Sequence, residues 1–202
     1  MSSYALDFCI IMDASGKMGP IIETVRKAAK SFIEKIIKTY FDKGLEVEEV
    51  NVRVMDFADF ATEGNDAIHM TDFLAFPQAG GAIAAAIDDY AYAGRGGDVS
   101  ENGLEALYLA VKAPWPALRA TMETRRILWM ATSSPALPLQ ARAGQSDYDE
   151  YGFPADLDGL RAAWDAFVAD SNGTAQLMLF APDDPNWAAV AAWPHVRYQQ
   201  IG

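Results

Sequence analysis

The sequence predicts an α/β fold, a three-layer α/β/α sandwich around a doubly wound, mostly parallel sheet with one short antiparallel edge strand. Two patterns predict it. Strand-like apolar segments alternate with amphipathic, helix-like segments along the whole chain. The strand segments are largely continuous in apolar character, which is typical of strands covered on both faces. The 202 residues contain no internal repeat and no long linker, so we expect a single domain over 1–202.

The predicted strands follow from the apolar runs. Four central strands are expected at 4–12, 50–57, 126–132 and 175–181. The segment 67–73 is expected to form the short edge strand, and 196–200 a last short strand. Because parallel strands need crossover connections, the helices between them should cover both faces of the sheet.

The predicted helices follow from apolar residues that recur at helical spacing. The clearest is 21–41, where charged residues occupy the opposite side and Gly44 is a plausible stop. Further helices are expected at 79–92, 101–113, 156–170 and 185–193. Ser100 is expected to be the N-cap of the helix at 101–113. The polar segment 140–152, with its acidic cluster, is expected to be an exposed loop.

The net negative charge of the chain argues against two classes of binding partner. The chain has 16 Lys and Arg against 28 Asp and Glu, a formal net charge of −12. Such a chain is a poor candidate for binding nucleic acid or an anionic membrane surface, which both attract clustered basic residues. The excess acid lies mostly away from the candidate site described below, so we interpret it as favouring solubility.

Two further observations bear on the compartment. Cys9 is the single cysteine, which excludes an internal disulfide, and its apolar surroundings predict a buried small hydrophobe. The sequence shows no secretory signal and no apolar run of the length that a membrane-spanning helix needs. We therefore expect a cytoplasmic protein.

Candidate site residues follow the predicted strands. In open α/β sheets, ligands bind at the carboxyl ends of the strands, where the loops 13–19, 94–101 and 132–138 should meet. Asp13 and Ser15 offer a carboxylate and a hydroxyl, which are ligands that a hard divalent cation prefers. The alternative is that the two residues only stabilise the turn and cap the following helix.

Five segments resemble the von Willebrand factor A family, and they span nearly the whole chain. The first loop, Asp13-Ala-Ser-Gly-Lys-Met18, resembles the Asp-x-Ser-x-Ser signature of the family. The most specific segment is Gly96-Gly-Asp-Val-Ser-Glu-Asn-Gly-Leu-Glu-Ala-Leu107, which is similar to a run found in bacterial members. The remaining matches are Val52-Arg-Val-Met-Asp-Phe-Ala-Asp59, Ile127-Leu-Trp-Met-Ala-Thr-Ser-Ser-Pro-Ala136 and Leu177-Met-Leu-Phe-Ala-Pro-Asp183.

The resemblance implies a Rossmann-like fold and a metal-ion-dependent adhesion site, with Asp13, Ser15 and Asp98 as the ligands if the site is occupied. Two positions depart from the family pattern, because Lys17 replaces a serine and Ser133 replaces an aspartate. An ammonium about 4 Å from a dication repels it by roughly 8 kcal/mol at an effective dielectric of about 20. We therefore expect a degenerate site with no cofactor, in which Lys17 bridges Asp13 and Asp98.

The resemblance implies protein binding rather than catalysis, as in bacterial stand-alone members of the family. We expect a non-enzymatic interaction module that binds a protein partner through the carboxyl-end face of its sheet. Lys17, Thr132, Ser133 and Glu101 are the candidates for contacting the partner or replacing the metal.

Three alternatives stay open at this stage. One is a magnesium-dependent adhesion or assembly protein. Another is a structural subunit of a larger assembly, homo-oligomeric or not. The third is a phosphoryl-transfer enzyme of doubly wound fold that uses Asp13, for which Lys17 is the nearby basic group.

Overall fold

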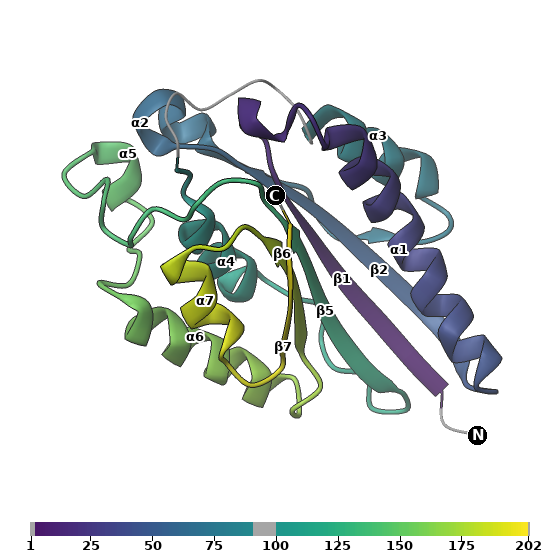
Figure 1. Ribbon diagram of the computed structural model, residues 1–202. Coiled ribbons are helices and arrows are strands. Elements are labelled where there is room, and N and C mark those ends of the chain that lie inside the picture. Colours follow the sequence, from purple (N-terminus) through teal and green to yellow (C-terminus); the bar gives the residue numbers. More distant parts are fainter. Residues whose placement is uncertain (1–2, 91–99, 202) are drawn as a thin grey trace.

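The computed structural model describes residues 3–90 and 100–201. Asp98, the Gly94–Gly97 segment and the last two residues of the helix expected at 79–92 lie outside the described residues. In the described part, strands and helices alternate along the chain, as the sequence predicts (Figure 1).

A seven-stranded sheet forms the centre of the fold. Its strands are β1 (Ser3–Asp13), β2 (Glu46–Phe57), β3 (Ile68–Met70), β4 (Leu74–Ala75), β5 (Glu123–Ala131), β6 (Gln176–Ala181) and β7 (Val196–Gln200). Their order is β3-β2-β1-β5-β6-β7, and β4 also pairs with β2. The pairs among β2, β1, β5, β6 and β7 are parallel, whereas β3 and β4 both run antiparallel to β2. The predicted mostly parallel sheet is confirmed, and its antiparallel edge consists of two short strands rather than one.

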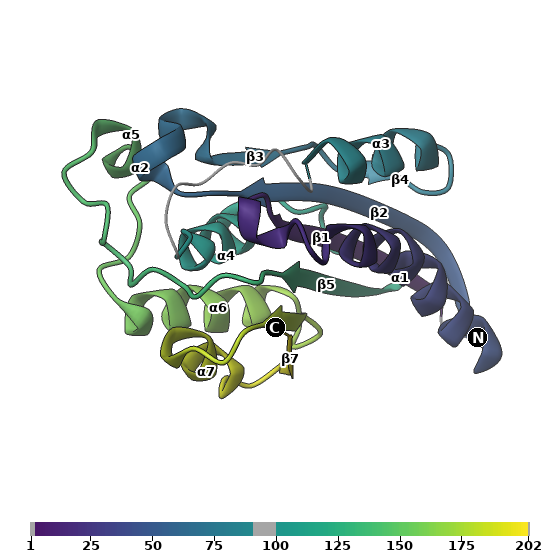
Figure 2. The same cartoon turned by 45° about the horizontal axis from the view of Figure 1, so that its top comes forward.

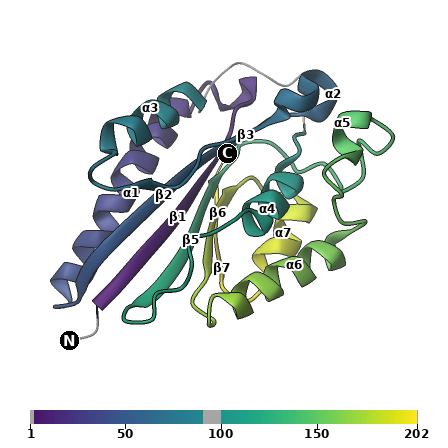
Figure 3. The ribbon, with the colours of Figure 1, turned by 180° about the vertical axis from the view of Figure 1, so that it is seen from behind.

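Helices cover both faces of this sheet. One layer contains α1 (Ile22–Asp42) and α3 (Gly80–Tyr90), and the other contains α4 (Gly103–Lys112), α6 (Leu157–Asp170) and α7 (Pro185–Ala191). Figure 2 shows α1 and α3 over the part of the sheet that contains β1 and β2, and Figure 3 shows the opposite layer from behind. Short helices α2 (Phe60–Glu63) and α5 (Ser146–Asp149) lie near one end of the sheet, with the 3₁₀ turns η1 (Gly16–Met18) and η2 (Gly64–Ala67).

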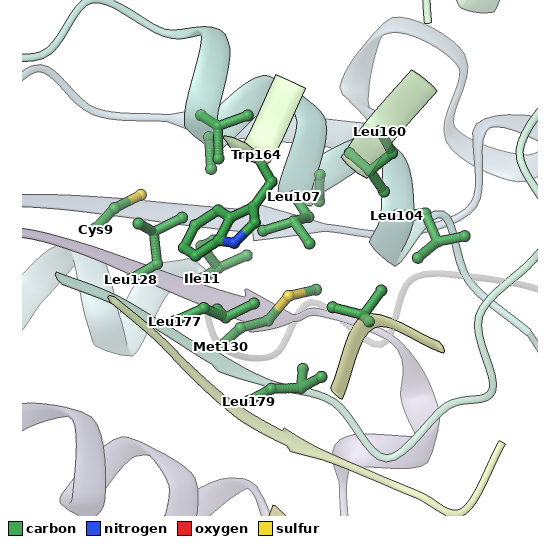
Figure 4. Packing of buried hydrophobic residues seen from close by; sticks show 14 of the residues in the cluster. Cys9, Ile11, Leu104, Leu107, Leu128, Met130, Leu160, Trp164, Leu177 and Leu179 are labelled. Atoms are coloured by element: carbon green, nitrogen blue, oxygen red, sulfur yellow. The ribbon is translucent and has the colours of Figure 1, made fainter. Parts of the chain in front are cut away.

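Each face of the sheet has its own apolar core. Side chains of α4, α6 and α7 pack against one face, and Figure 4 shows the indole of Trp164 among Leu107, Ile11 and Leu128. Side chains of α1 and α3 pack against the other face. Cys9 is fully buried in the first core, where burial raises the pKa of its thiol to about 12. This agrees with the prediction that Cys9 packs as a small hydrophobe.

The predicted start of the helix at 101–113 is wrong. The helix expected from residue 101 begins at Gly103 with Asn102 as its N-cap, so Ser100 does not cap it. The backbone of Glu101 pairs instead with the chain at Ala136, which holds it out of the helix.

The segment 140–152 is not simply an exposed loop. It contains α5, and its Tyr148 is only 1% exposed. Tyr148 packs edge-on to Phe60 and also contacts Phe153. These aromatic side chains form a small third core. No helix in the described part of the chain is long and apolar enough to cross a membrane.

Candidate functional site

The carboxyl ends of β1 and β5 bring Asp13 and Thr132 together. Asp13 is the last residue of β1 and Thr132 directly follows β5, and both are fully buried. The Thr132 hydroxyl donates to Asp13 Oδ2 over 2.7 Å, and the Ser15 backbone N–H donates to Asp13 Oδ1 over 2.8 Å. Both carboxylate oxygens therefore accept a hydrogen bond from a neutral donor, as a buried polar group requires.

A second layer of hydrogen bonds fixes the loop after β5. Ser134 N–H donates to Thr132 Oγ1 over 3.0 Å, and the Trp187 indole N–H donates to the Ser134 carbonyl over 3.1 Å. The hydroxyl oxygens of Ser15 and Ser134 lie 3.3 Å apart. Ser134 thus belongs to the site, although the sequence analysis had singled out its neighbour Ser133. The pair of serines after the strand was the signal that could have identified it.

Glu101 joins the site through its backbone. Its N–H donates to the Pro135 carbonyl over 3.1 Å, and its carbonyl accepts from Leu137 N–H over 3.0 Å. The side chain is only 1% exposed. Glu101 therefore pairs the loop before α4 with the loop after β5.

Lys17 and Ser133 differ from these buried residues. Lys17 lies in the 3₁₀ turn η1 and is exposed, and no described cation forms an ion pair with Asp13. The Asp13 half of the expected Lys17 bridge is therefore not formed, because Asp13 is buried behind the turn and its oxygens have other donors. The half toward Asp98 lies outside the described residues. Ser133 is half-buried, and its hydroxyl lacks a hydrogen-bond partner among the described residues.

The side chains around Asp13 offer the oxygen atoms that a magnesium ion prefers, but they carry only one negative charge to balance it. Asp13, Ser15, Thr132 and Ser134 supply oxygen atoms, which magnesium prefers, and magnesium is commonly held through one or two carboxylates with water completing its shell. Asp13 is the one carboxylate in this hydrogen-bonded group. Within residues 3–90 and 100–201, no three His, Cys, Asp or Glu side chains gather in a way that could hold a metal.

A buried polar cluster lies on the β2 side of the same edge, and the sequence analysis missed it. Asp59 is the N-cap of α2, and its carboxylate forms two hydrogen bonds with the Arg142 guanidinium. Nearby, the Tyr148 hydroxyl donates to Glu105 Oε1 over 2.8 Å. Burial raises the pKa of Glu105 to about 7, although the hydrogen bond from Tyr148 opposes that shift. Burial and the adjacent Glu105 also raise the pKa of Tyr148.

The fold of the chain is similar to that of solved structures of known proteins. Two structures of the pilus adhesin SpaC from Lactobacillus rhamnosus GG, one in an open conformation, align with TM-scores of 0.55 and 0.54 at 14% identity. A von Willebrand factor type A protein from Catenulispora acidiphila aligns with a TM-score of 0.50 at 18% identity. The chain has a von Willebrand factor A-like fold.

The similarity extends over this chain but over only part of each matched chain. The alignments cover 98% and 100% of this chain, but only 28% of the SpaC chain and 39% of the Catenulispora chain. At such low identity the likeness shows the fold alone. No protein-family model and no curated protein matches the sequence. The function of this von Willebrand factor A-like chain must therefore be argued from its own residues.

Proposed function

We propose that this chain is a non-enzymatic protein-interaction module that binds its partner through the carboxyl-end edge of the sheet. The observation that carries the proposal is the hydrogen-bonded group of Asp13, Ser15, Thr132 and Ser134, which joins the loops after β1 and β5. A rigid edge loses little conformational entropy when a partner binds. The likeness to a pilus adhesin agrees with a role in protein contact.

Exposed and half-exposed groups at this edge are the proposed contacts. Lys17 offers a cation on the exposed side of the η1 turn, and the half-buried Ser133 lies on the neighbouring loop after β5, with its hydroxyl oxygen buried. A lysine ammonium attracts a carboxylate as a point charge. The proposed partner therefore presents an acidic side chain, which Lys17 meets without a metal ion.

A blocking substitution tests the proposal. Ser133→Arg places a long side chain at the edge, and Thr39→Arg makes the same kind of change on the exposed side of α1. Wild type and both variants are immobilised, and proteins retained from a lysate of the source organism are quantified by mass spectrometry. We expect a partner that wild type and Thr39→Arg retain and Ser133→Arg loses. Equal retention by all three proteins would refute binding at this edge.

The identified partner then separates the metal-free mode from the magnesium-dependent alternative, which the oxygen donors around Asp13 favour. In the metal-free mode, binding persists in EDTA and Lys17→Ser weakens it. In the magnesium-dependent mode, EDTA abolishes binding and calorimetry detects magnesium binding that Asp13→Ala removes. The alternative replaces the metal-free mode if the second pattern is observed.

A further inference from the structure

The sheet face that carries α1 is covered over only part of its width. Helix α1 lies over β1, with the rings of Phe32 and Phe8 5.8 Å apart and those of Tyr40 and Tyr4 4.9 Å apart. Helix α3 packs on the β2 side of α1. Among the described helices, only α1 and α3 pack on this face, and Figure 2 shows both over the part that contains β1 and β2.

The β5–β6–β7 part of this face is apolar and incompletely covered. Ile127 of β5 and Met178 and Phe180 of β6 point to the α1 side and are each only half-buried. The strand register places Arg197 of β7 beside Met178, and Gln199 beside Phe180, and both β7 residues are exposed. Parallel sheets of this class normally have both faces covered by helices.

A cavity of about 330 Å³ marks this strip. Its α1 wall contains Ala28, Phe32 and Lys35, and its floor contains Trp129, Phe180 and Ile201. The Trp129 and Phe180 rings lie 5.4 Å apart and form the centre of the floor. We call this feature the α1–β6 groove.

The strip has the width of one helix. Neighbouring strands lie about 4.8 Å apart, so β6, two strands from β1, is roughly 10 Å from it. Packed helices have interaxial distances of about 8–10 Å. A helix that packs beside α1 would therefore be centred over β6, on the half-buried Met178 and Phe180.

The charge of the groove is opposite to that of the chain. The net charge of the protein is −12, yet Lys35 is the one charged side chain among the described residues that line the cavity. Arg197, on the neighbouring strand, adds a second exposed cation on the same face. We propose that the α1–β6 groove binds an amphipathic helix of a partner protein, whose apolar stripe covers Phe180 and Met178 and whose acidic flanks face Lys35 and Arg197.

This surface is separate from the carboxyl-end edge, so its occupant does not depend on the function proposed above. Binding should combine the burial of apolar side chains, which supplies affinity, with charge complementarity, which selects among helices. The expected binding sequence has apolar residues at i, i+3, i+4 and i+7, with Glu or Asp beside them.

The test uses a displayed library of amphipathic helices as the probe. The library has a fixed apolar stripe and randomised flanks, and selection is on the full chain. We expect enrichment of acidic flanks and displacement of the selected helices by Phe180→Asp. In the charge-reversal variant Lys35→Glu/Arg197→Glu, affinity for a selected helix should fall by about tenfold or more. A version of that helix with Lys in place of each Glu should prefer this variant over wild type.

The matched control is Lys27→Glu/Lys43→Glu, which makes the same charge change at exposed residues outside the groove and should bind like wild type. The proposal is overturned if no helix is enriched, or if selected helices bind the charge-reversal variant as tightly as the control. It is also overturned if light scattering shows a wild-type dimer that Lys35→Glu/Arg197→Glu dissociates, since the occupant is then a second copy. The charge-reversal variant keeps the test valid if Phe180→Asp fails to fold.

Discussion

The Thr132 hydroxyl donates a 2.7 Å hydrogen bond to Asp13 Oδ2, joining two fully buried side chains that lie 119 positions apart in the chain. The same hydroxyl oxygen accepts from Ser134 N–H over 3.0 Å. One threonine therefore satisfies a buried carboxylate oxygen and a buried amide. It also fixes the loop after β5 relative to the end of β1, which is why we place the binding edge there.

Replacing Thr132 with valine should destabilise the fold. The substitution keeps the shape of the side chain but leaves Asp13 Oδ2 and Ser134 N–H without their bonds to the hydroxyl. An unsatisfied buried polar group costs about 1–3 kcal/mol, and we expect a loss of that size in urea unfolding. Thr132→Ser, which keeps the hydroxyl, should retain most of the stability.

The control for Thr132→Val is Thr39→Val on α1. Thr39 also donates a hydrogen bond, to the Lys35 carbonyl, but it is exposed to water. Its loss should change the free energy of unfolding by no more than about 0.5 kcal/mol. A Thr132→Val protein as stable as Thr39→Val would show that the Asp13–Thr132 bond does not hold the two loops together.

The ion pair between Asp59 and Arg142 should hold the segment 140–152 on the domain. Asp59 is 1% exposed, so Arg142→Met would leave a buried carboxylate without the cation that pairs with it. Removing one partner of a buried pair costs about 3–5 kcal/mol. We expect hydrogen exchange in 140–152 to accelerate strongly.

The comparison for Arg142→Met is Arg161→Met, which breaks a surface pair with Asp165 within α6. Surface pairs of this kind contribute about 0.3–0.5 kcal/mol, so exchange in 140–152 should stay as in wild type. Slow exchange in that segment in both variants would mean that the aromatic contacts of Tyr148 suffice to hold it.

The pattern of apolar residues was enough to predict most strands of the sheet and the order of strands and helices along the chain. Continuous apolar runs such as those of β1 and β5 are buried on both faces, and this signal is local in sequence. The segment 140–152 was mispredicted because its polar composition hides Tyr148 and Arg142, whose partners Phe60 and Asp59 are far away in the chain. A contact between distant segments leaves no local pattern.

The candidate site was predictable only in part for the same reason. Asp13 and Ser15 lie two residues apart after a strand, so their proximity follows from the sequence. The role of Ser134 depends on its distance from Ser15 and on Trp187, which only the folded chain brings together. The expected contact between Lys17 and Asp13 is not formed, because Lys17 is exposed whereas Asp13 is fully buried. The spacing of residues in a sequence does not show which side of a turn faces the solvent.

Gly103, the first residue of α4, should tolerate no side chain. A Cβ atom there would lie 2.6 Å from Cζ2 of Trp187, whose ring is fully buried. Forcing an extra carbon into a packed core costs about 1–3 kcal/mol, so Gly103→Ala should lower the melting temperature. Gly16→Ala is the control, since no atom lies within 4 Å of the added carbon. A Gly103→Ala/Trp187→Leu double variant should be less destabilised than the sum of the two single variants.

Glu105 should make the stability of the domain depend on pH near neutrality. Burial raises the pKa of its carboxyl from 4.5 to about 7, so between these values the folded protein holds a proton that the unfolded chain has released. The stability from this group is therefore fully present below pH 4.5 and is lost as the pH rises through about 7. Glu105→Gln keeps an oxygen that can accept from Tyr148 but cannot ionise.

Urea unfolding of wild type and Glu105→Gln at a series of pH values between about 4.5 and 8 measures this effect. Relative to the variant, wild type should lose up to about 3 kcal/mol across that range, since each pKa unit corresponds to about 1.4 kcal/mol. The other titrating groups contribute equally to both proteins and cancel in the difference. A constant difference between Glu105→Gln and wild type would mean that the Glu105 carboxyl ionises at an ordinary pKa.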